Sequence, residues 1–289
     1  VANLDISEVE RLPALAGEAD LIRTLHLMPG IQTGTDGIDG LHVRGGSNGQ
    51  NLIMIDGVPV YNIAHAAGLF SVFNTNAIKS ARLYKSGFPA RYGGRLSSVL
   101  DIRTRDGNNQ NYDAEANVGL LAGRLTLEGP IQKGKSSFIL SGRRSLVGWY
   151  LQPLTESLRS SEEAQRQSFL DYDFYDLNAK LNFTLSKRDD LYFSFYKGKD
   201  AYQNRELSVD TLLVQDDSVP EPALFRSHQS DLEEMNWGNT VASMRWTHLF
   251  GDQLFSSLTA SYSGLDVGIQ YEQVDSLTAL EAEIGRAHV

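Results

Sequence analysis

The strongest constraint on the fold is a run of strict two-residue alternation in DLNAKLNFTLS, residues 176–186. Leucine, alanine and phenylalanine occupy every odd position from 177 to 185, and asparagine, lysine, threonine and serine occupy the even positions. Side chains alternate between the two faces of a strand, so this period excludes a helix and predicts one apolar and one polar face. AGRLTLEGPI at 122–131 and DLYFSFY at 190–196 repeat the pattern.

The connections between such segments indicate what kind of sheet they form. Short polar turns are expected at 132–135, 186–190 and 250–253, and two long polar stretches, about 146–171 and 203–235, are expected to be loops. A soluble sandwich also alternates, but short turns at one end and long loops at the other are typical of outer-membrane barrels. We predict seven strands, at about 112–119, 122–130, 135–144, 173–185, 190–199, 237–249 and 253–269. Seven strands do not close a transport-sized barrel, so we expect an open wall with an unpaired last strand.

The first 106 residues have a different texture. Ser7–Glu10 has the pattern of a capping box, and Ala19–Leu25 predicts one or two helical turns that end before Pro29-Gly30. Short strands are predicted at 41–44, 51–56, 80–85 and 97–104. The predicted fold is therefore an α+β domain over residues 1–110, followed over 111–283 by an incomplete antiparallel transmembrane β-barrel.

Composition excludes several classes of protein and site. The 36 acidic and 26 basic residues give a net charge of −10, which argues against a general nucleic-acid partner. There are no cysteines, so thiolate zinc sites, disulfides and cysteine nucleophiles are excluded. No apolar run approaches the roughly 18 residues of a transmembrane helix, and no signal peptide is visible. Residues 284–289 look like a translated sequencing adapter and are expected to be an artefact.

One motif suggests an enzyme. Gly45-Gly46-Ser47-Asn48-Gly49 fits G-x-S-x-G, and Asp56 and His65 follow in the order of a hydrolase triad. A nucleophile elbow needs a helix after the serine, but the following residues, NLIMI, predict a strand that ends in an Asp-Gly hairpin turn. A phosphate-binding loop is excluded as well, because no Gly-Lys-Ser/Thr follows. We therefore expect a glycine-rich turn and no enzyme.

Longer motifs carry a family resemblance. VRGGSNGQNLIMIDGVPVYN and GLFSVFNTNAIKSARLYKSGFPARYGGRLSSVLDIRT, both in the first 105 residues, resemble the plug domain of TonB-dependent outer-membrane receptors. RLTLEGPIQKGKSSFILSGRRSL, which follows, resembles the first strands of their barrel. The resemblance implies a plug inside a barrel of about 22 strands, of which this chain holds about seven. It implies energy-coupled import of a scarce or bulky ligand, with a non-transporting surface or signalling receptor as the alternative.

The resemblance also implies site residues and partners. The matching plug residues are Arg44, Gly45, Gly46, Asp56, Gly57, Tyr92, Gly93, Gly94 and Arg95. Expected partners are TonB, whose box would lie upstream of this fragment, outer-membrane lipid, and an imported ligand that is an iron chelate, cobalamin, a peptide or a glycan. A surface lipoprotein is not favoured, because Ile53-Met54-Ile55-Asp56-Gly57 differs from the Val-Ile-Asp-Gly strand usual in receptors with such a lipoprotein.

Side chains of the plug offer several further hypotheses. Tyr61, Asn62 and His65 are candidates for a ligand-facing plug apex, and the six histidines show no metal-ligand spacing. No cofactor is expected. The seven basic residues between Lys79 and Arg105 either attract anionic ligands or pair with acidic groups of the wall; in the second, favoured case Arg44 and Arg95 would be anchors. The acidic stretch 203–235 is expected to be a solvated loop, with cation binding as the alternative. Trp149, Tyr150, Trp237 and Trp246 are expected either in interface belts or in the core.

Overall fold

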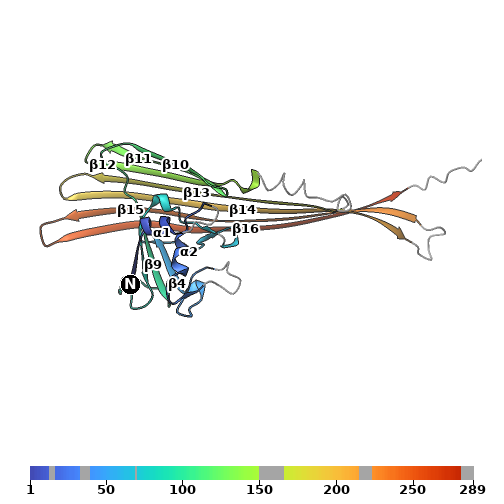
Figure 1. Ribbon diagram of the computed structural model, residues 1–289, viewed down its shortest axis with the longest axis horizontal. Helices are drawn as coiled ribbons and strands as arrows, with labels where there is room; N and C mark the ends of the chain where they lie inside the picture. The colour runs from blue at the N-terminus through green and yellow to red at the C-terminus, as the bar shows by residue number, and fades with distance from the viewer. Residues whose placement is uncertain (13–16, 33–39, 69, 150–165, 215–222, 281–289) are drawn as a thin grey trace, which may run out of the picture. The chain divides into compact units, whose positions relative to one another are not determined.

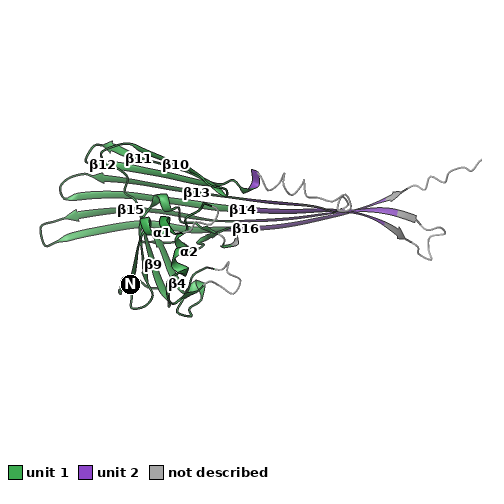
Figure 2. Cartoon of the chain, in the orientation of Figure 1, with its two compact units in different colours: residues 1–147, 173–200, 237–266 green, residues 148–172, 201–236, 267–289 purple. Residues whose placement is uncertain are grey.

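The computed structural model describes residues 1–12, 17–32, 40–68, 70–149, 166–214 and 223–280 (Figure 1). The chain divides into two compact units (Figure 2). Unit 1 holds residues 1–147, 173–200 and 237–266, and unit 2 holds 148–172, 201–236 and 267–289. The suspected adapter at 284–289 lies outside the described residues.

The first part of unit 1 is the expected α+β domain. Its elements are β1 (Ala2–Asp5), α1 (Ile6–Arg11), α2 (Leu21–His26), β2 (Ile31–Gln32), β3 (His42–Val43), η1 (Asn48–Gln50), β4 (Asn51–Ile55), β5 (Val58–Pro59), β6 (Ala64–His65), η2 (Ala66–Gly68), β7 (Phe70–Ser71), η3 (Thr75–Ala77), β8 (Ile78–Tyr84) and β9 (Ser98–Thr104). Five of the strands form a mixed sheet in the order β1-β8-β9-β4-β5, in which β4 and β9 are parallel. The helical turns predicted before Pro29 are present as α2, which begins after the N-cap Asp20.

The start of α1 differs from the predicted capping box. Asp5, not Ser7, is the N-cap residue, and its carboxylate accepts a hydrogen bond from the Ser7 backbone N–H at 3.0 Å. Aspartate is as good an N-cap as serine, so the helix begins two positions earlier than the Ser-x-x-Glu pattern indicates. This start turns Ile6 and Val9 into the core.

The core of this domain is apolar and fully enclosed. Leu21 and Leu25 of α2 pack with Leu83 of β8 and with Leu100 and Ile102 of β9, all at most 1 % exposed. Burial of such side chains is the main source of folding free energy, so the domain has its own stable core.

Seven further strands form an antiparallel sheet in strict chain order, as predicted. They are β10 (Asp113–Val118), β11 (Ala122–Gln132), β12 (Ser136–Ser145), β13 (Arg166–Thr184), β14 (Asp189–Val214), β15 (Ala223–Leu249) and β16 (Phe255–Leu280). Tight turns join β11 to β12, β13 to β14 and β15 to β16, where short turns were expected. The described strands β10 and β16 are the two ends of the sheet, so it is not closed.

The acidic stretch 203–235 was expected to be a loop, and that expectation was wrong for its described residues; residues 215–222 lie outside them. Residues 203–214 continue β14 and residues 223–235 belong to β15. Cross-strand contacts there are polar; for example, the Gln203 amide donates to the Glu234 carboxylate at 2.7 Å. Backbone hydrogen bonds between strands do not require an apolar face. The strands therefore continue beyond the residues that alternate between apolar and polar. The same holds for residues 166–171, which belong to β13.

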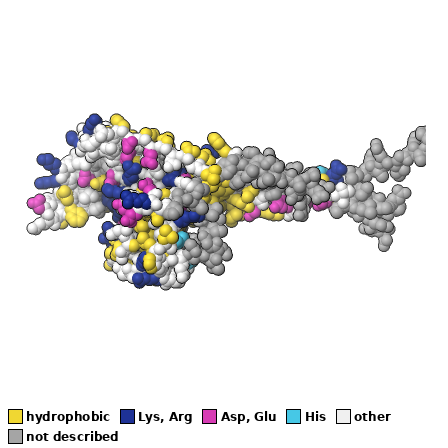
Figure 3. All heavy atoms as spheres, viewed as in Figure 1, with side chains coloured by type: hydrophobic (Ala, Val, Ile, Leu, Met, Phe, Trp, Pro, Cys, Tyr) yellow, Lys and Arg dark blue, Asp and Glu magenta, His cyan; other side chains and the backbone are white. Residues whose placement is uncertain are grey.

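In unit 1 the polar face of the sheet is buried and its apolar face is exposed, which is the reverse of the arrangement in a soluble protein. On β11–β13 the polar positions face the α+β domain and are buried: Arg124, Thr126, Glu128, Ser141, Arg143, Asp176, Asn178 and Lys180. The apolar positions between them are exposed: Leu125, Leu127, Leu140, Leu177 and Leu181. Figure 3 shows such hydrophobic side chains along the upper edge of the view, over β10–β12. Below, the part of the seven-stranded sheet that belongs to unit 1, from β10 to β16, is called the wall.

Within the described residues, none of the helices is long and apolar enough to span a bilayer. Trp149 and Trp246 are exposed, and Tyr150 lies outside the described residues. The interface-belt assignment of these aromatic residues stays a prediction.

Candidate functional site

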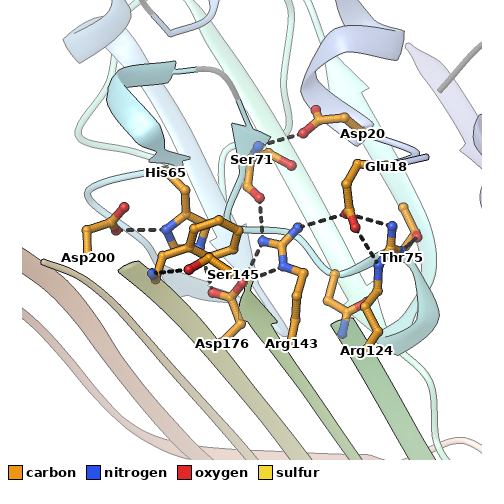
Figure 4. A network of polar contacts seen from close by, with 12 residues as sticks. Glu18, Asp20, His65, Ser71, Thr75, Arg124, Arg143, Ser145, Asp176 and Asp200 are labelled. Carbon is orange, nitrogen blue, oxygen red and sulfur yellow. Dashed lines mark hydrogen bonds and ion pairs between the residues drawn. The ribbon is translucent and has the colours of Figure 1, made fainter. Parts of the chain in front are cut away.

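The contact between the α+β domain and the wall is dominated by a buried network of charges (Figure 4). Its first centre is Glu18, which lies between two arginines of the wall. Arg124 Nη2 and Nε lie 2.6 and 3.3 Å from the two Glu18 oxygens, and Arg143 Nη1 lies 3.7 Å from the nearer one. All three side chains are at most 5 % exposed. Ion pairs in such an environment hold only with good geometry and further hydrogen bonds.

Those further hydrogen bonds are present. Arg124 also donates to the Thr75 hydroxyl and the Asn76 side-chain oxygen, at 3.0 and 3.1 Å. Arg143 donates through Nε and Nη2 to one Asp176 oxygen, at 2.7 and 2.5 Å, and through Nη2 to the Ser71 carbonyl at 2.7 Å. The two arginines therefore tie Glu18, Ser71 and the η3 turn to the wall.

The second centre is His65, which is fully buried. Its Nε2 lies 2.9 Å from Asp176 Oδ1, and its Nδ1 lies 2.7 Å from Asp200 Oδ2. A carboxylate is an acceptor only, so both ring nitrogens donate and the ring is an imidazolium. Although burial lowers the pKa of His65, the charges of Asp176 and Asp200 and their hydrogen bonds outweigh it, and the net pKa is raised. With His65 charged, the three cations Arg124, Arg143 and His65 face the carboxylates of Glu18, Asp176 and Asp200.

The hairpin between β4 and β5 forms a second junction. Asp56 and Gly57 have φ of +49° and +86°, which is the geometry of the predicted tight turn. The Asp56 carboxylate accepts hydrogen bonds from the Thr104 backbone N–H at 3.1 Å and from the Ser194 hydroxyl of the wall at 2.7 Å. Lys180 Nζ lies 3.6 Å from the same carboxylate. Asp56 therefore links its hairpin both to β9 of the same domain and to the wall.

The ligand-facing candidates lie in different environments. Tyr61 is 54 % exposed. Asn62 is partly buried, and its carbonyl accepts a hydrogen bond at 2.6 Å from the Asn239 side chain of β15. His65 was expected at the apex but is enclosed by the wall. The position of His65 in a loop of the sequence does not indicate that Asp176 and Asp200, from two distant strands, both bind its ring.

The glycine motifs form turns within the α+β domain. Arg44 and Gly45 have φ of +50° and +78°, and the turn is closed by a hydrogen bond from Gly46 N to Val43 O at 2.9 Å. At Gly46 a Cβ would lie 2.4 Å from the Ser97 hydroxyl oxygen, so glycine is required by close packing.

The second glycine motif begins with Tyr92, whose hydroxyl donates to Asp101 at 3.1 Å. It continues through Gly93 to Gly94, whose φ is +78°.

Among the described residues, the expected anchors Arg44 and Arg95 form no hydrogen bond or ion pair with the wall. Arg44 donates to the Ser86 hydroxyl at 2.9 Å and Arg95 to the Gly94 carbonyl at 2.8 Å, both within the domain. Of the seven basic residues at 79–105, Arg105 does pair with the wall, through Glu128. At the Glu18 centre the polarity is the opposite of the expected one, with arginines on the wall and a glutamate on the domain.

Sequence reasoning missed Arg124 and Arg143, although a signal exists. Both occupy polar positions of alternating strands, and the register of β11 and β12 places them directly opposite each other. Like charges at paired positions destabilise a sheet, so such a pair calls for an anion from another element. Glu18 supplies it.

The hydrolase interpretation is not supported by the geometry. Ser47 precedes the short turn η1, and strand β4 follows, so a nucleophile elbow is absent from this described segment. Asp56 binds Thr104 and Ser194, and His65 binds Asp176 and Asp200, so the three triad candidates do not meet. Among the described residues no group of three or more His, Asp or Glu side chains is arranged to hold a metal ion.

Comparison with known proteins identifies the family of residues 6–98. Residues 6–98 match the TonB-dependent Receptor Plug Domain. The fold is similar to a variant of the ferric enterobactin receptor PfeA from Pseudomonas aeruginosa (TM-score 0.46, 15 % identity, 92 % of this chain and 45 % of that one). It is also similar to the siderophore receptor PirA from Acinetobacter baumannii (0.48, 12 %, 98 % and 59 %). A third similar structure is the outer membrane transporter YddB from Escherichia coli (0.45, 10 %, 96 % and 54 %).

This chain thus spans about half the length of each of these proteins. The family assignment rests on the plug match, which covers α1 through the start of β9. We therefore identify residues 6–98 as the plug domain of a TonB-dependent outer-membrane receptor, followed in this chain by an open antiparallel sheet.

Proposed function

We propose that the protein imports a ligand across the outer membrane with energy supplied through TonB. In this proposal residues 1–110 are the plug, and residues 111–283 are the first strands of a larger barrel that encloses it. The observation that carries the proposal is the burial of the wall. Its polar face is covered by the plug and its apolar face is exposed, as a wall between lipid and a plugged lumen requires.

The contact between plug and wall supports a movable plug rather than a permanent core. It is made by ion pairs and hydrogen bonds around Glu18, His65 and Asp56, while the apolar core lies mainly inside the plug itself. A polar contact can exchange its partners for water, so the plug can shift without exposing its core. Tyr61 and Asn62 are proposed to face the ligand, and TonB is the proposed periplasmic partner.

The test uses the full-length gene in its own host. A deletion strain is complemented with the wild-type gene or with a version that lacks the TonB box, and it is given labelled ferric chelates, cobalamin, oligopeptides and glycans in turn. One labelled class is expected to accumulate only with the wild-type gene. If no class accumulates while the protein is present in the outer membrane, the alternative of a non-transporting receptor is correct.

A further inference from the structure

A cavity of about 310 Å³ lies between the plug and the wall, apart from the network around Glu18 and His65. Plug strands β8 and β9 line one side, and wall strands β13, β14 and β15 line the other. This volume is at the lower limit of small-molecule sites, and corresponds to about ten water molecules in the liquid. The cavity therefore has room for a charged group and part of the solute that carries it.

The lining carries an excess of positive charge. It includes four cations, Lys79, Arg103, Lys180 and Arg245, and two carboxylates, Asp56 and Asp106. Asp106 is bound by Lys79 and Lys180, each at 2.9 Å, and Lys180 also lies 3.6 Å from Asp56, so the two carboxylates together offset the two lysines. Asp56 is held by Thr104 and Ser194, with Lys180 at 3.6 Å.

The two arginines are less fully paired. Arg103 lies 3.2 Å from Asp101, but its side chain is 39 % exposed. Arg245 has no carboxylate within ion-pair distance among the described residues. It donates to the Asp56 carbonyl at 3.2 Å and to the Thr259 hydroxyl at 3.3 Å, which orients the guanidinium and leaves its positive charge uncompensated.

Neutral donors surround these cations. Ser80, Tyr192 and Ser243 line the same cavity with hydroxyl groups. Guanidinium groups bind carboxylate and phosphate oxygens with two parallel hydrogen bonds, and hydroxyls complete such sites. A cavity lined mainly by one sign of charge also concentrates counter-ions.

We propose that this cavity binds an oxyanion, namely the carboxylate or phosphate group of a solute that passes between plug and wall. Arg245 is the principal ligand of that group, and Arg103 and the hydroxyls assist. That the solute passes between plug and wall rests on the proposed import function. Binding of the oxyanion in the cavity does not depend on that function. The imported solute is accordingly an anionic one.

The test measures binding without transport. Full-length receptor in detergent, without TonB, is dialysed to equilibrium against ³²P-labelled inorganic phosphate at low ionic strength. Wild type is expected to bind phosphate saturably. Arg245→Gln is expected to weaken binding by roughly tenfold or more, because a charged hydrogen-bond donor is lost. The matched control is Arg144→Gln, which removes the same charge at an exposed wall residue that pairs with Asp173.

Competition identifies the source of the group. If acetate displaces phosphate, the site takes carboxylates as well; if it does not, the site takes phosphate groups. Absence of saturable binding in wild type, or equal weakening by both substitutions at unchanged thermal stability, would overturn the proposal. If the receptor binds phosphate but imports nothing, the proposed import function is wrong and the anion site stands. If Arg245→Gln abolishes binding but leaves import unchanged, the imported solute does not pass through this cavity.

Discussion

Arg124 and Arg143 lie directly opposite each other on neighbouring strands of the wall, and both guanidinium groups reach Glu18 of the plug. Without that carboxylate the two cations would face each other in a buried environment. Glu18 therefore stabilises the wall as well as the contact with the plug. It lies two residues before Asp20, the N-cap of α2, and so close to the start of that helix.

Loss of the Glu18 charge is expected to weaken the plug strongly. Removing one partner of a buried ion pair leaves a buried charge unpaired and costs about 3–5 kcal/mol. We expect Glu18→Gln to lower the free energy of plug unfolding by this amount, measured by urea denaturation of the full-length receptor. Glu115→Gln on the exposed strand β10 is the control, with little expected effect. Equal effects of the two substitutions would show that Glu18 is not an anchor.

The pH dependence of plug stability is expected to follow His65. Because the pKa of His65 is raised in the folded state, its contribution is fully present below about pH 6.5, the value in the unfolded chain. The contribution is lost as the pH rises through the folded-state pKa. The charged or titratable groups around the ring are Asp176, Asp200, Arg143 and Tyr196.

Urea midpoints measured from about pH 6 to about pH 9 check this expectation. Wild type should lose stability toward alkaline pH, and His65→Gln should be less stable near pH 6 but have a flatter profile. If the slopes of wild type and His65→Gln agree, His65 does not carry the pH dependence.

Much of the fold could be predicted because it depends on local patterns. The alternation at 177–185 fixes which face of β13 is apolar, and the Asp56-Gly57 dipeptide fixes a hairpin. The seven strands and their tight turns follow from such signals. The full length of β14 and β15 could not be predicted. Their polar ends are paired by backbone hydrogen bonds, which do not require a pattern of apolar residues in the sequence.

The charged network could be predicted only in part. Nothing close in sequence to His65 indicates that Asp176 and Asp200 will enclose it, since those contacts span 111 and 135 positions. The pairing of Arg124 with Arg143 could have been predicted from the sequence, because the register of β11 and β12 follows from the turn that joins them. Identifying Glu18 as their partner needs the packing of plug against wall.

A side chain at Gly57 is expected to destabilise the Asp56-Gly57 turn. Its φ of +86° disfavours any residue with a Cβ, and a Cβ there would lie 3.2 Å from the Arg245 guanidinium. We expect Gly57→Ala to cost about 1–2 kcal/mol of plug stability, as for other left-handed positions. Gly49→Ala is the control, because a Cβ there meets no atom within 4 Å. A Gly57→Ala receptor as stable as Gly49→Ala would show that the turn relaxes to another geometry.

The exposed apolar face of the wall is expected to lie in lipid. Leu140 is 41 % exposed and is paired with Leu127 and Ala179 on the two neighbouring strands, so it lies within the apolar surface. A charge at the middle of a lipid-facing strand costs about 2–4 kcal/mol, whereas the same charge in water costs little. Leu140→Arg should therefore reduce the yield of full-length receptor folded into lipid vesicles, measured by heat-modifiable gel mobility. Leu27→Arg, at an exposed leucine of the plug, should leave the yield unchanged. If both variants fold equally well, Leu140 faces water, and the inverted burial of the wall needs another explanation.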